Sequence, residues 1–461
     1  MVSRLRLQLA AVAVLALAWT QSVRLEPKRE SGILPIEPPT PFVHYFAQGP
    51  PRGTVLVVHG LDVSKEVMHV ISGSLADGGF DVYSIDLPGH GDSNVTFNTE
   101  RAQQTIRNAK KYLGDKITVL GHSLGAGLLL DLSATEPFST IVLLSPPPLS
   151  VAEIRADRVL IATGEIDIPR IRNFAAIATD IGNPIVESWI LPWGGHSAPI
   201  FSPTYIHRIL EWLGGDSSKA RTLARIVWMI VMFLAAISVG ILLLPAARGV
   251  EPAQISARAT LVTYIVSAAV SLVILKFVNP LQWLRLFASD YLIGFVLVTG
   301  LSVLAFASKT TKVERPNSRL FIGIISAVFV IAVPGFLVVS RVLHMSLSDG
   351  RWWRFPFIAM AGLPLFVSDE LTIRRIQPRW KSEAVALLTR GVFLAFILTG
   401  VLTLNRNDAF LVLIAPLVVA FWIALWFAAG VVHRSTQSPL AAAIFAALVQ
   451  GWAFAAWFVT I

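Results

Sequence analysis

Long apolar segments follow one another through the C-terminal half of the chain. Each is long enough, or nearly so, to cross the roughly 30 Å hydrocarbon core of a bilayer as a helix. The uninterrupted segments are residues 226–244, 259–275, 291–307, 320–340, 409–432 and 440–461. A soluble core does not house so many uniformly apolar helices in sequence. We therefore expect an all-α transmembrane bundle over residues 218–461.

Two further segments are less regular. Residues 384–404 are apolar except for Arg390, and residues 355–367 form a short apolar run that contains Pro364. With these two segments we predict seven or eight membrane-spanning helices. We interpret Arg390, and Asp290 near the start of another segment, as interfacial charges that reach toward the lipid head groups.

Other polar residues of this half have open interpretations. Asp369 and Glu370 form an acidic pair in a basic loop, which is either a second functional site or a feature of topology. We expect His344 and His433 in membrane loops.

The composition agrees with an integral membrane protein. Hydrophobic residues make up 54% of the chain and charged residues only 15%, whereas soluble proteins are about a quarter charged. The net charge is +9, but Lys and Arg beside apolar segments set topology and meet anionic lipid, so we expect no nucleic-acid partner. Cysteine is absent, which excludes disulfides, thiolate metal sites and cysteine nucleophiles.

Residues 1–24 have the pattern of a secretory signal. Arg4 and Arg6 precede an apolar run at residues 9–19, and residues 16–18 resemble a cleavage site. A retained signal anchor fits the same residues, so both alternatives stay open. With eight C-terminal helices, the excess of Lys and Arg in the loops predicts that residues 25–217 lie outside the cytoplasm; with seven, the excess reverses.

Residues 25–217 have the composition of an ordinary folded domain. We interpret residues 25–41, which are rich in proline and charge, as an extended linker or entry arm. Short apolar runs then alternate with amphipathic stretches such as residues 100–113 and 124–134. The predicted strands are residues 54–58, 80–85, 117–120, 140–144, 159–162 and 188–191. This alternation predicts an α/β fold with a parallel sheet covered on both faces.

The strongest local motif is Gly121-His122-Ser123-Leu124-Gly125. It follows a predicted strand and opens a predicted helix, which is the context of a nucleophile elbow. Small residues are needed there because the serine backbone is strained and neighbouring strands approach closely. The motif therefore makes Ser123 the candidate nucleophile.

Residues 42–214 resemble the α/β-hydrolase superfamily, particularly its monoacylglycerol-lipase-like and serine-aminopeptidase-like branch. His59-Gly60 resembles the family's oxyanion-hole turn, and residues 86–93 (DLPGHGDS) are close to the family's D-x-P-G-H-G-x-S turn. The resemblance covers under half of the chain and says nothing about the apolar half.

The resemblance implies a catalytic triad in the order serine, acid, histidine. Asp167 fits the family's acid position, with Glu165 as the alternative, and His196 follows the last predicted strand. The oxyanion would be held by the backbone N–H groups of Leu61 and Leu124. We expect His59 to form hydrogen bonds near this site rather than to catalyse.

These residues predict a membrane-bound serine hydrolase of the esterase or lipase kind, with thioesterase or peptidase activity not excluded. We expect no metal and no organic cofactor. Residues 146–157 are too short for the cap domain of many relatives, so we expect no cap. We hypothesise that the site faces the bilayer and takes a lipid or another amphipathic ester.

Two other functions stay open. In a membrane acyltransferase, the apolar domain would present a lipid acceptor to the same acyl-enzyme. In a transporter or sensor, the hydrolase-like domain would only bind a ligand. The sequence does not predict the oligomeric state.

Overall fold

The computed structural model describes residues 2–148, 154–180, 185–244, 255–307, 319–337, 339–341, 343–348, 350–405 and 410–461. The chain divides into two compact units, each described by itself below. The sheet unit comprises Ala11–Ala236, Leu337–Ser348 and Val459–Ile461. The helical unit comprises Met1–Ala10, Ile237–Phe336 and Asp349–Phe458.

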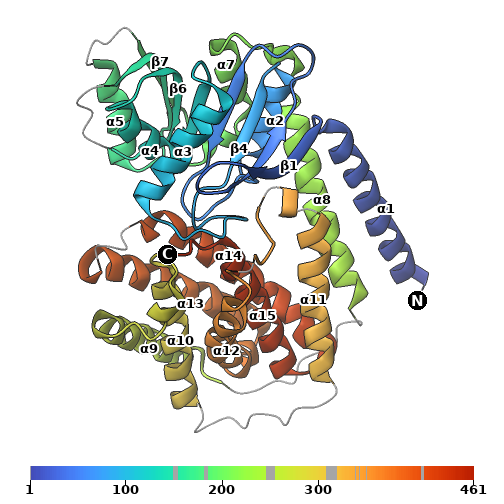
Figure 1. The fold of residues 1–461 in the computed structure, drawn as a ribbon. Coiled ribbons are helices and arrows are strands. Elements are labelled where there is room, and N and C mark those ends of the chain that lie inside the picture. Colours follow the sequence, from blue (N-terminus) through green and yellow to red (C-terminus); the bar gives the residue numbers. More distant parts are fainter. Residues whose placement is uncertain are drawn as a thin grey trace. The chain divides into compact units, whose positions relative to one another are not determined.

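The sheet unit is built on one eight-stranded sheet (Figure 1). Its order is β1-β2-β4-β3-β5-β6-β7-β8. From β4 to β8 all neighbouring pairs are parallel, whereas β2 pairs antiparallel with both β1 and β4. The strands are β1 (Arg29–Leu34), β2 (Thr40–Tyr45), β3 (Thr54–Val58), β4 (Asp81–Ile85), β5 (Thr118–His122), β6 (Phe138–Leu144), β7 (Ala156–Gly164) and β8 (Val186–Leu191).

The interpretation of residues 25–41 as a linker is wrong, because they contain all of β1 and the start of β2. β1 is the outer strand of the sheet, and most of its residues are exposed. An edge strand that buries little needs no alternation of apolar and polar residues, so it leaves a weak signal in the sequence.

Helices cover both faces of the sheet. On one face the core includes residues of α2 (His69–Asp77), α6 (Ala198–Phe201) and α7 (Pro203–Trp212). On the other it includes residues of α3 (Thr99–Leu113), α4 (Leu124–Ser133) and α5 (Pro169–Asp180).

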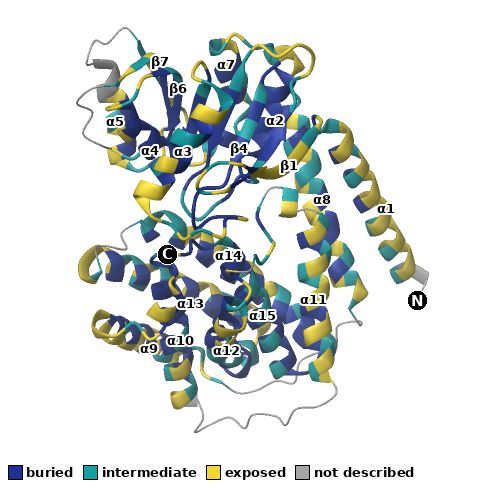
Figure 2. Ribbon diagram, in the orientation of Figure 1, coloured by how far each residue is buried: buried dark blue, intermediate teal, exposed yellow. Residues whose placement is uncertain are grey.

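The buried central strands explain why their sequences are apolar throughout. Val55 and Val57 of β3 belong to the first core, and Leu56 and Val58 belong to the second. Because side chains alternate across a strand, both faces must be apolar when both are covered. Figure 2 shows these strands as buried.

The start of α8 (Thr222–Leu243) belongs to the sheet unit and is tied to α2 by charge. Asp77 at the end of α2 is fully buried and forms ion pairs with Arg221 at 2.6 Å and Arg225 at 2.9 Å. Ser74 and Thr222 add a hydroxyl–hydroxyl hydrogen bond of 2.8 Å. Two arginines paired with one carboxylate thus fix the start of α8 against the end of α2.

Nine helices among the described residues are long and apolar enough to cross a membrane, judged by length and composition. They fit a multi-pass membrane protein. Besides α8 they are α1 (Val2–Leu25), α9 (Ala257–Phe277), α10 (Ser289–Ala307), α11 (Arg319–Leu337), α12 (Arg354–Leu371), α13 (Arg379–Thr399), α14 (Leu411–Thr436) and α15 (Pro439–Trp457).

Within the helical unit, α12 packs against α10 and α15, α9 against α10 and α13, and α14 against α13 and α15. The segment around Pro364 is a full helix, α12, which continues through the proline. Several charged loop residues used for the predicted orientation, Arg248, Lys309, Lys312, Arg315 and Arg406, lie outside the described residues. The orientation therefore stays a prediction.

The predicted interfacial position of Arg390 is wrong. Its side chain is 1% exposed and forms an ion pair with Asp369, which also accepts a hydrogen bond of 2.7 Å from Tyr264 Oη. Glu370 is buried as well, and it pairs with Arg374 at 2.9 Å and with His433. Pairing with an opposite charge on a neighbouring helix offsets part of the desolvation cost of a charge inside an apolar helix.

Candidate active site

Ser123 lies at a sharp turn between β5 and α4. Its backbone adopts φ 50° and ψ −114°, a strained conformation for a residue with a side chain. The turn leaves no room for larger residues: a Cβ at Gly125 would lie 2.6 Å from the carbonyl oxygen of Val58 in β3. The glycine is therefore required by the close approach of the helix to the neighbouring strand, as a nucleophile elbow demands.

The structure brings Ser123, His196 and Asp167 together from three loops at the carboxyl ends of β5, β8 and β7. His196 Nε2 lies 2.9 Å from Ser123 Oγ. His196 Nδ1 lies 2.9 and 3.1 Å from the two carboxylate oxygens of Asp167. A hydroxyl, an imidazole and a carboxylate in this chain of hydrogen bonds can generate a serine nucleophile.

Asp167, rather than Glu165, is the carboxylate beside the histidine. Its carboxylate accepts hydrogen bonds from Thr163 Oγ1 at 2.8 Å and from the N–H of Ile168 at 2.7 Å. Burial alone would raise the pKa of Asp167, but the hydrogen bond with His196 and the one from Thr163 outweigh burial and lower it. Glu165 is exposed and accepts a hydrogen bond from the N–H of Trp193 instead.

The loop that carries His196 is held through its backbone. Ser145 Oγ donates a 2.8 Å hydrogen bond to the carbonyl oxygen of His196, and His122 Nε2 lies 3.2 Å from the same oxygen. Ser145 directly follows β6 and has a positive φ of 48°. The sequence analysis missed Ser145. The available signal was its position directly after β6, which lies between β5 and β7, the strands that precede Ser123 and Asp167.

Of the two backbone groups predicted for the oxyanion hole, one lies at the start of a helix and the other in the turn after β3. Leu124 is the first residue of α4, and Leu61 follows Gly60 after β3. A Cβ at Gly60 would lie 3.2 Å from Cβ of Ser123, so this turn passes directly beside the nucleophile.

His59 forms hydrogen bonds near the site, as predicted, and these bonds join two loops. Its Nδ1 lies 2.7 Å from the carbonyl oxygen of Gly60, and its Nε2 accepts a 3.0 Å hydrogen bond from the N–H of Leu87. Nε2 therefore carries no proton, and Nδ1 is the donor. Burial lowers the pKa of His59, which keeps the ring neutral in this role.

A lysine that the sequence analysis missed joins the same two loops. Lys65 Nζ lies 2.6 Å from Asp86, 2.6 Å from Asp92 and 2.9 Å from Glu66. Burial alone would lower the pKa of Lys65, but the three carboxylates raise it. Burial would likewise raise the pKa of Asp86, and Lys65 lowers it. Asp86 of the D-x-P-G-H-G motif thus anchors the loop after β3.

Residues 459–461 also lie against these loops. The N–H of Val459 donates to Asp62 Oδ1 at 3.0 Å, next to Leu61. The N–H of Thr460 donates to the carbonyl oxygen of Gly89 at 3.0 Å, and Thr460 accepts from the N–H of Phe97 at 2.8 Å. The last residues of the chain thereby brace both loops at the edge of the site.

One family model matches part of the sheet unit. Residues 55–227 match the model of a family described as the alpha/beta hydrolase family. The sheet unit has the α/β-hydrolase fold. A helical region with several apolar helices follows it, and β7 begins at Ala156, shortly after β6 ends at Leu144. No curated protein matches the chain.

Similar solved structures include a lipase and two esterases. A Paleococcus ferrophilus monoacylglycerol lipase is 18% identical, with a TM-score of 0.35, and the match covers 41% of this chain and 100% of that chain. A Pyrococcus furiosus esterase is 17% identical, with a TM-score of 0.36, covering 42% and 94%. A Bacillus subtilis carboxylesterase is 18% identical, with a TM-score of 0.36, covering 47% and 100%.

Proposed function

We propose that the protein is a membrane-bound serine hydrolase that cleaves carboxylic esters through an acyl-enzyme on Ser123. The observation that carries the proposal is the hydrogen-bonded row of three side chains. Ser123 Oγ is 2.9 Å from His196 Nε2, and His196 Nδ1 is 2.9 Å from Asp167. Its setting in an α/β-hydrolase fold supports the same reaction.

In the proposed reaction, His196 Nε2 takes the proton of Ser123 as Oγ attacks the acyl carbonyl carbon. Asp167 stabilises the imidazolium that forms. The N–H groups of Leu61 and Leu124 donate to the tetrahedral oxyanion. When the intermediate collapses, the alcohol leaves with the proton from His196. Water then attacks the acyl-enzyme by the same steps and releases the acid.

The substrate class follows from apolar side chains beside the triad. Trp193 is 85% exposed and lies three residues before His196, and Ile166, next to Asp167, is 64% exposed. Their loops are joined by a 2.8 Å hydrogen bond from the N–H of Ile166 to the carbonyl oxygen of Gly194. Large exposed apolar side chains at a site favour an apolar ligand. We infer an amphipathic, lipid-like ester.

Labelling with a fluorophosphonate probe tests the nucleophile. The full chain in detergent should react with the probe, and Ser123→Ala should abolish labelling while it leaves the thermal melting temperature nearly unchanged. A folded wild-type protein that does not react would contradict the hydrolase proposal and favour a transporter or sensor whose domain only binds a ligand.

The substrate class needs a separate comparison. Trp193→Ala should lower kcat/KM several-fold for long-chain acyl esters and leave it nearly unchanged for acetyl esters. Equal effects on both chain lengths would contradict a lipid-like substrate but not the serine mechanism. Product analysis with and without a lipid alcohol distinguishes hydrolysis from acyl transfer, because both reactions pass through the same acyl-enzyme.

A further inference from the structure

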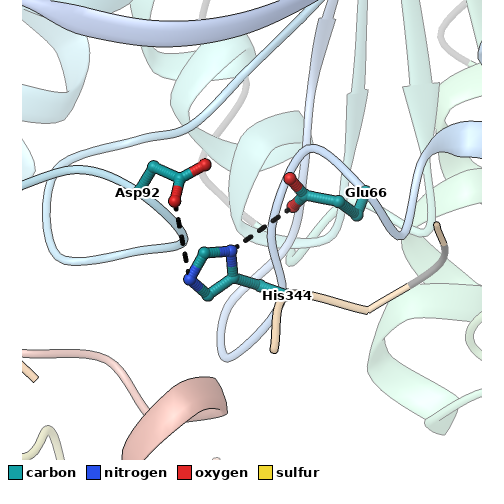
Figure 3. A group of neighbouring side chains, drawn as sticks. All are labelled: Glu66, Asp92 and His344. Carbon is teal, nitrogen blue, oxygen red and sulfur yellow. Dashed lines mark ion pairs between the residues drawn. The ribbon is translucent and has the colours of Figure 1, made fainter. Parts of the chain in front are cut away.

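Three side chains from distant parts of the sheet unit surround one point away from the triad. Glu66 lies in the loop after β3, Asp92 in the loop after β4, and His344 in the segment Leu337–Ser348. Figure 3 shows the imidazole of His344 between the two carboxylates. One donor atom from each of the three residues lies within 4.8 Å of the others.

The gaps between these atoms are too wide for hydrogen bonds. His344 Nε2 lies 3.8 Å from Asp92 Oδ1, and His344 Nδ1 lies 3.9 Å from Glu66 Oε2. Two ligands of a tetrahedral metal ion with bonds of about 2.0–2.2 Å lie ~3.4 Å apart. The two distances involve different ring nitrogens of His344. With one atom taken from each residue, the three donors lie within 4.8 Å of one another, a spacing closer to that of atoms that share an ion than to that of a hydrogen-bonded pair.

The side chains of His344 and Glu66 are largely buried at this point, whereas that of Asp92 is half exposed. The side chain of His344 is 4% exposed, and that of Glu66 is 13% exposed. Among the described residues, neither His344 Nε2 nor Glu66 Oε2 has a hydrogen-bond partner. A buried polar atom without a partner destabilises the folded state, so these two atoms require an explanation.

The local charge also favours a cation. Lys65 uses the other oxygen of each carboxylate, Glu66 Oε1 and Asp92 Oδ2, and it also pairs with Asp86. One lysine thus faces three carboxylates, which leaves two formal negative charges. A divalent cation on the free oxygens would neutralise the group, and Asp92, which is 46% exposed, leaves a side open to water.

We propose that Glu66 Oε2, Asp92 Oδ1 and a ring nitrogen of His344 bind one divalent transition-metal ion of the zinc class. An imidazole with two carboxylates suits Zn²⁺ better than Mg²⁺ or Ca²⁺, which prefer oxygen ligands alone. A movement of each donor by less than ~1 Å reaches ordinary bond lengths, and water completes the coordination. The sequence analysis predicted no metal, and this proposal departs from that prediction.

The ion would join three segments that no strand pairing joins. Glu66 is five residues beyond Leu61, and Asp92 follows the motif loop that begins at Asp86. Leu343, next to His344, packs against the core on the α2 face of the sheet. The site would therefore fix the segment Leu337–Ser348 on the two loops that border the active site, and it is independent of the hydrolytic reaction.

Zinc titration of the full chain tests the proposal. The protein in detergent is stripped with EDTA, dialysed and titrated calorimetrically with ZnCl₂, and bound metal is counted by elemental analysis. We expect one Zn²⁺ per chain, a higher melting temperature with zinc, and no competition by Mg²⁺. His344→Gln and Asp92→Asn should each weaken binding at least tenfold. Because Asp92 is half exposed, its variant should fold.

The matched control is His44→Gln. His44 also lies between two carboxylates, at 3.5 Å from Glu30 and 3.3 Å from Asp81, but these distances are within or near hydrogen-bonding range. Zinc binding should be unchanged in this variant. Equal zinc binding by wild type, His344→Gln and Asp92→Asn would overturn the proposal. So would a wild type that binds no zinc.

Discussion

Ser123 stores strain that the rest of the turn must oppose. Its positive φ is a conformation that costs a residue with a side chain on the order of 1–3 kcal/mol. The N–H of Ser123 donates 2.8 Å to the carbonyl oxygen of Leu144, and its own carbonyl accepts from Gly127 at 2.9 Å. The backbone of the strained residue is thereby fixed on both sides, and its Oγ lies 2.9 Å from His196 Nε2.

At the same scale, the two candidate acids can be separated by paired substitutions. Asp167→Asn keeps the size of the side chain but removes the charge that stabilises the imidazolium and the acceptor that selects its tautomer. We expect kcat on a chromogenic ester to fall about 10³–10⁴-fold. Glu165→Gln, at an exposed carboxylate bonded to Trp193, should stay within about threefold of wild type. A larger loss in Glu165→Gln would reverse the assignment.

His122 makes stability depend on pH. Burial, followed by the charge of His196, lowers the pKa of His122 from 6.5 to about 3. The folded ring therefore stays neutral between these values while the unfolded ring takes up a proton. The free energy of unfolding that neutral His122 contributes is fully present above pH 6.5 and is lost as the pH falls toward 3. For one proton, the free energy of unfolding falls by about 1.4 kcal/mol per pH unit.

His122→Gln should therefore flatten the decline of melting temperature between pH 6.5 and pH 4.5. The decline should not vanish, because burial lowers the pKa of His59 as well and gives the same sign. At pH 8 the two proteins should differ only by the lost hydrogen bond to His196. Melting curves that fall in parallel with pH would show that His122 takes up no proton on unfolding.

The sequence predicted the active-site residues unevenly. Ser123 was predicted from a local motif, and His196 from its position after the last strand. Two carboxylates only two residues apart, Glu165 and Asp167, could not be separated by chain order alone. The contacts of Lys65 and of His344 were not predictable, because their partners come together only through tertiary folding.

At the scale of elements, the approach of α4 to β3 is a tight constraint near the nucleophile. Gly125→Ala would put a Cβ 2.6 Å from the carbonyl oxygen of Val58. This oxygen belongs to the backbone of β3, which cannot move away as a flexible side chain could. We expect a loss of about 1–3 kcal/mol, seen as a melting temperature lower by several degrees, with reduced fluorophosphonate labelling. Gly53→Ala is the control, since its Cβ would meet Phe80 at an ordinary 3.9 Å.

The same scale explains which elements could be predicted. β3 agrees with its predicted bounds, and β4 to β8 differ by a few residues, because strands buried on both faces are apolar throughout. β1 was missed because its exposed residues carry no such pattern. Arg390 was misplaced for a related reason. A charge in an apolar run indicates either an interface or a buried pair, and the partner Asp369 lies on another helix.

For the whole molecule, the division into two compact units predicts that damage to one leaves the other's chemistry intact. Asp369→Asn leaves the buried guanidinium of Arg390 without a counter-charge, which should destabilise the helical unit by about 3–5 kcal/mol. Ser123, His196 and Asp167 all belong to the sheet unit. Thermal melts of the variant should therefore show an earlier transition, while fluorophosphonate labelling persists below that temperature.

Two further variants make this last test specific. Adding Arg390→Gln to Asp369→Asn should recover part of the lost stability, because it removes the unpaired charge. Glu383→Gln breaks the exposed ion pair with Arg379, whose side chain is 65% exposed, and should cost less than about 1 kcal/mol. If Asp369→Asn abolished labelling at temperatures where the protein remains folded, the active site would depend on the helical unit, and the two units would have to be treated as one functional body.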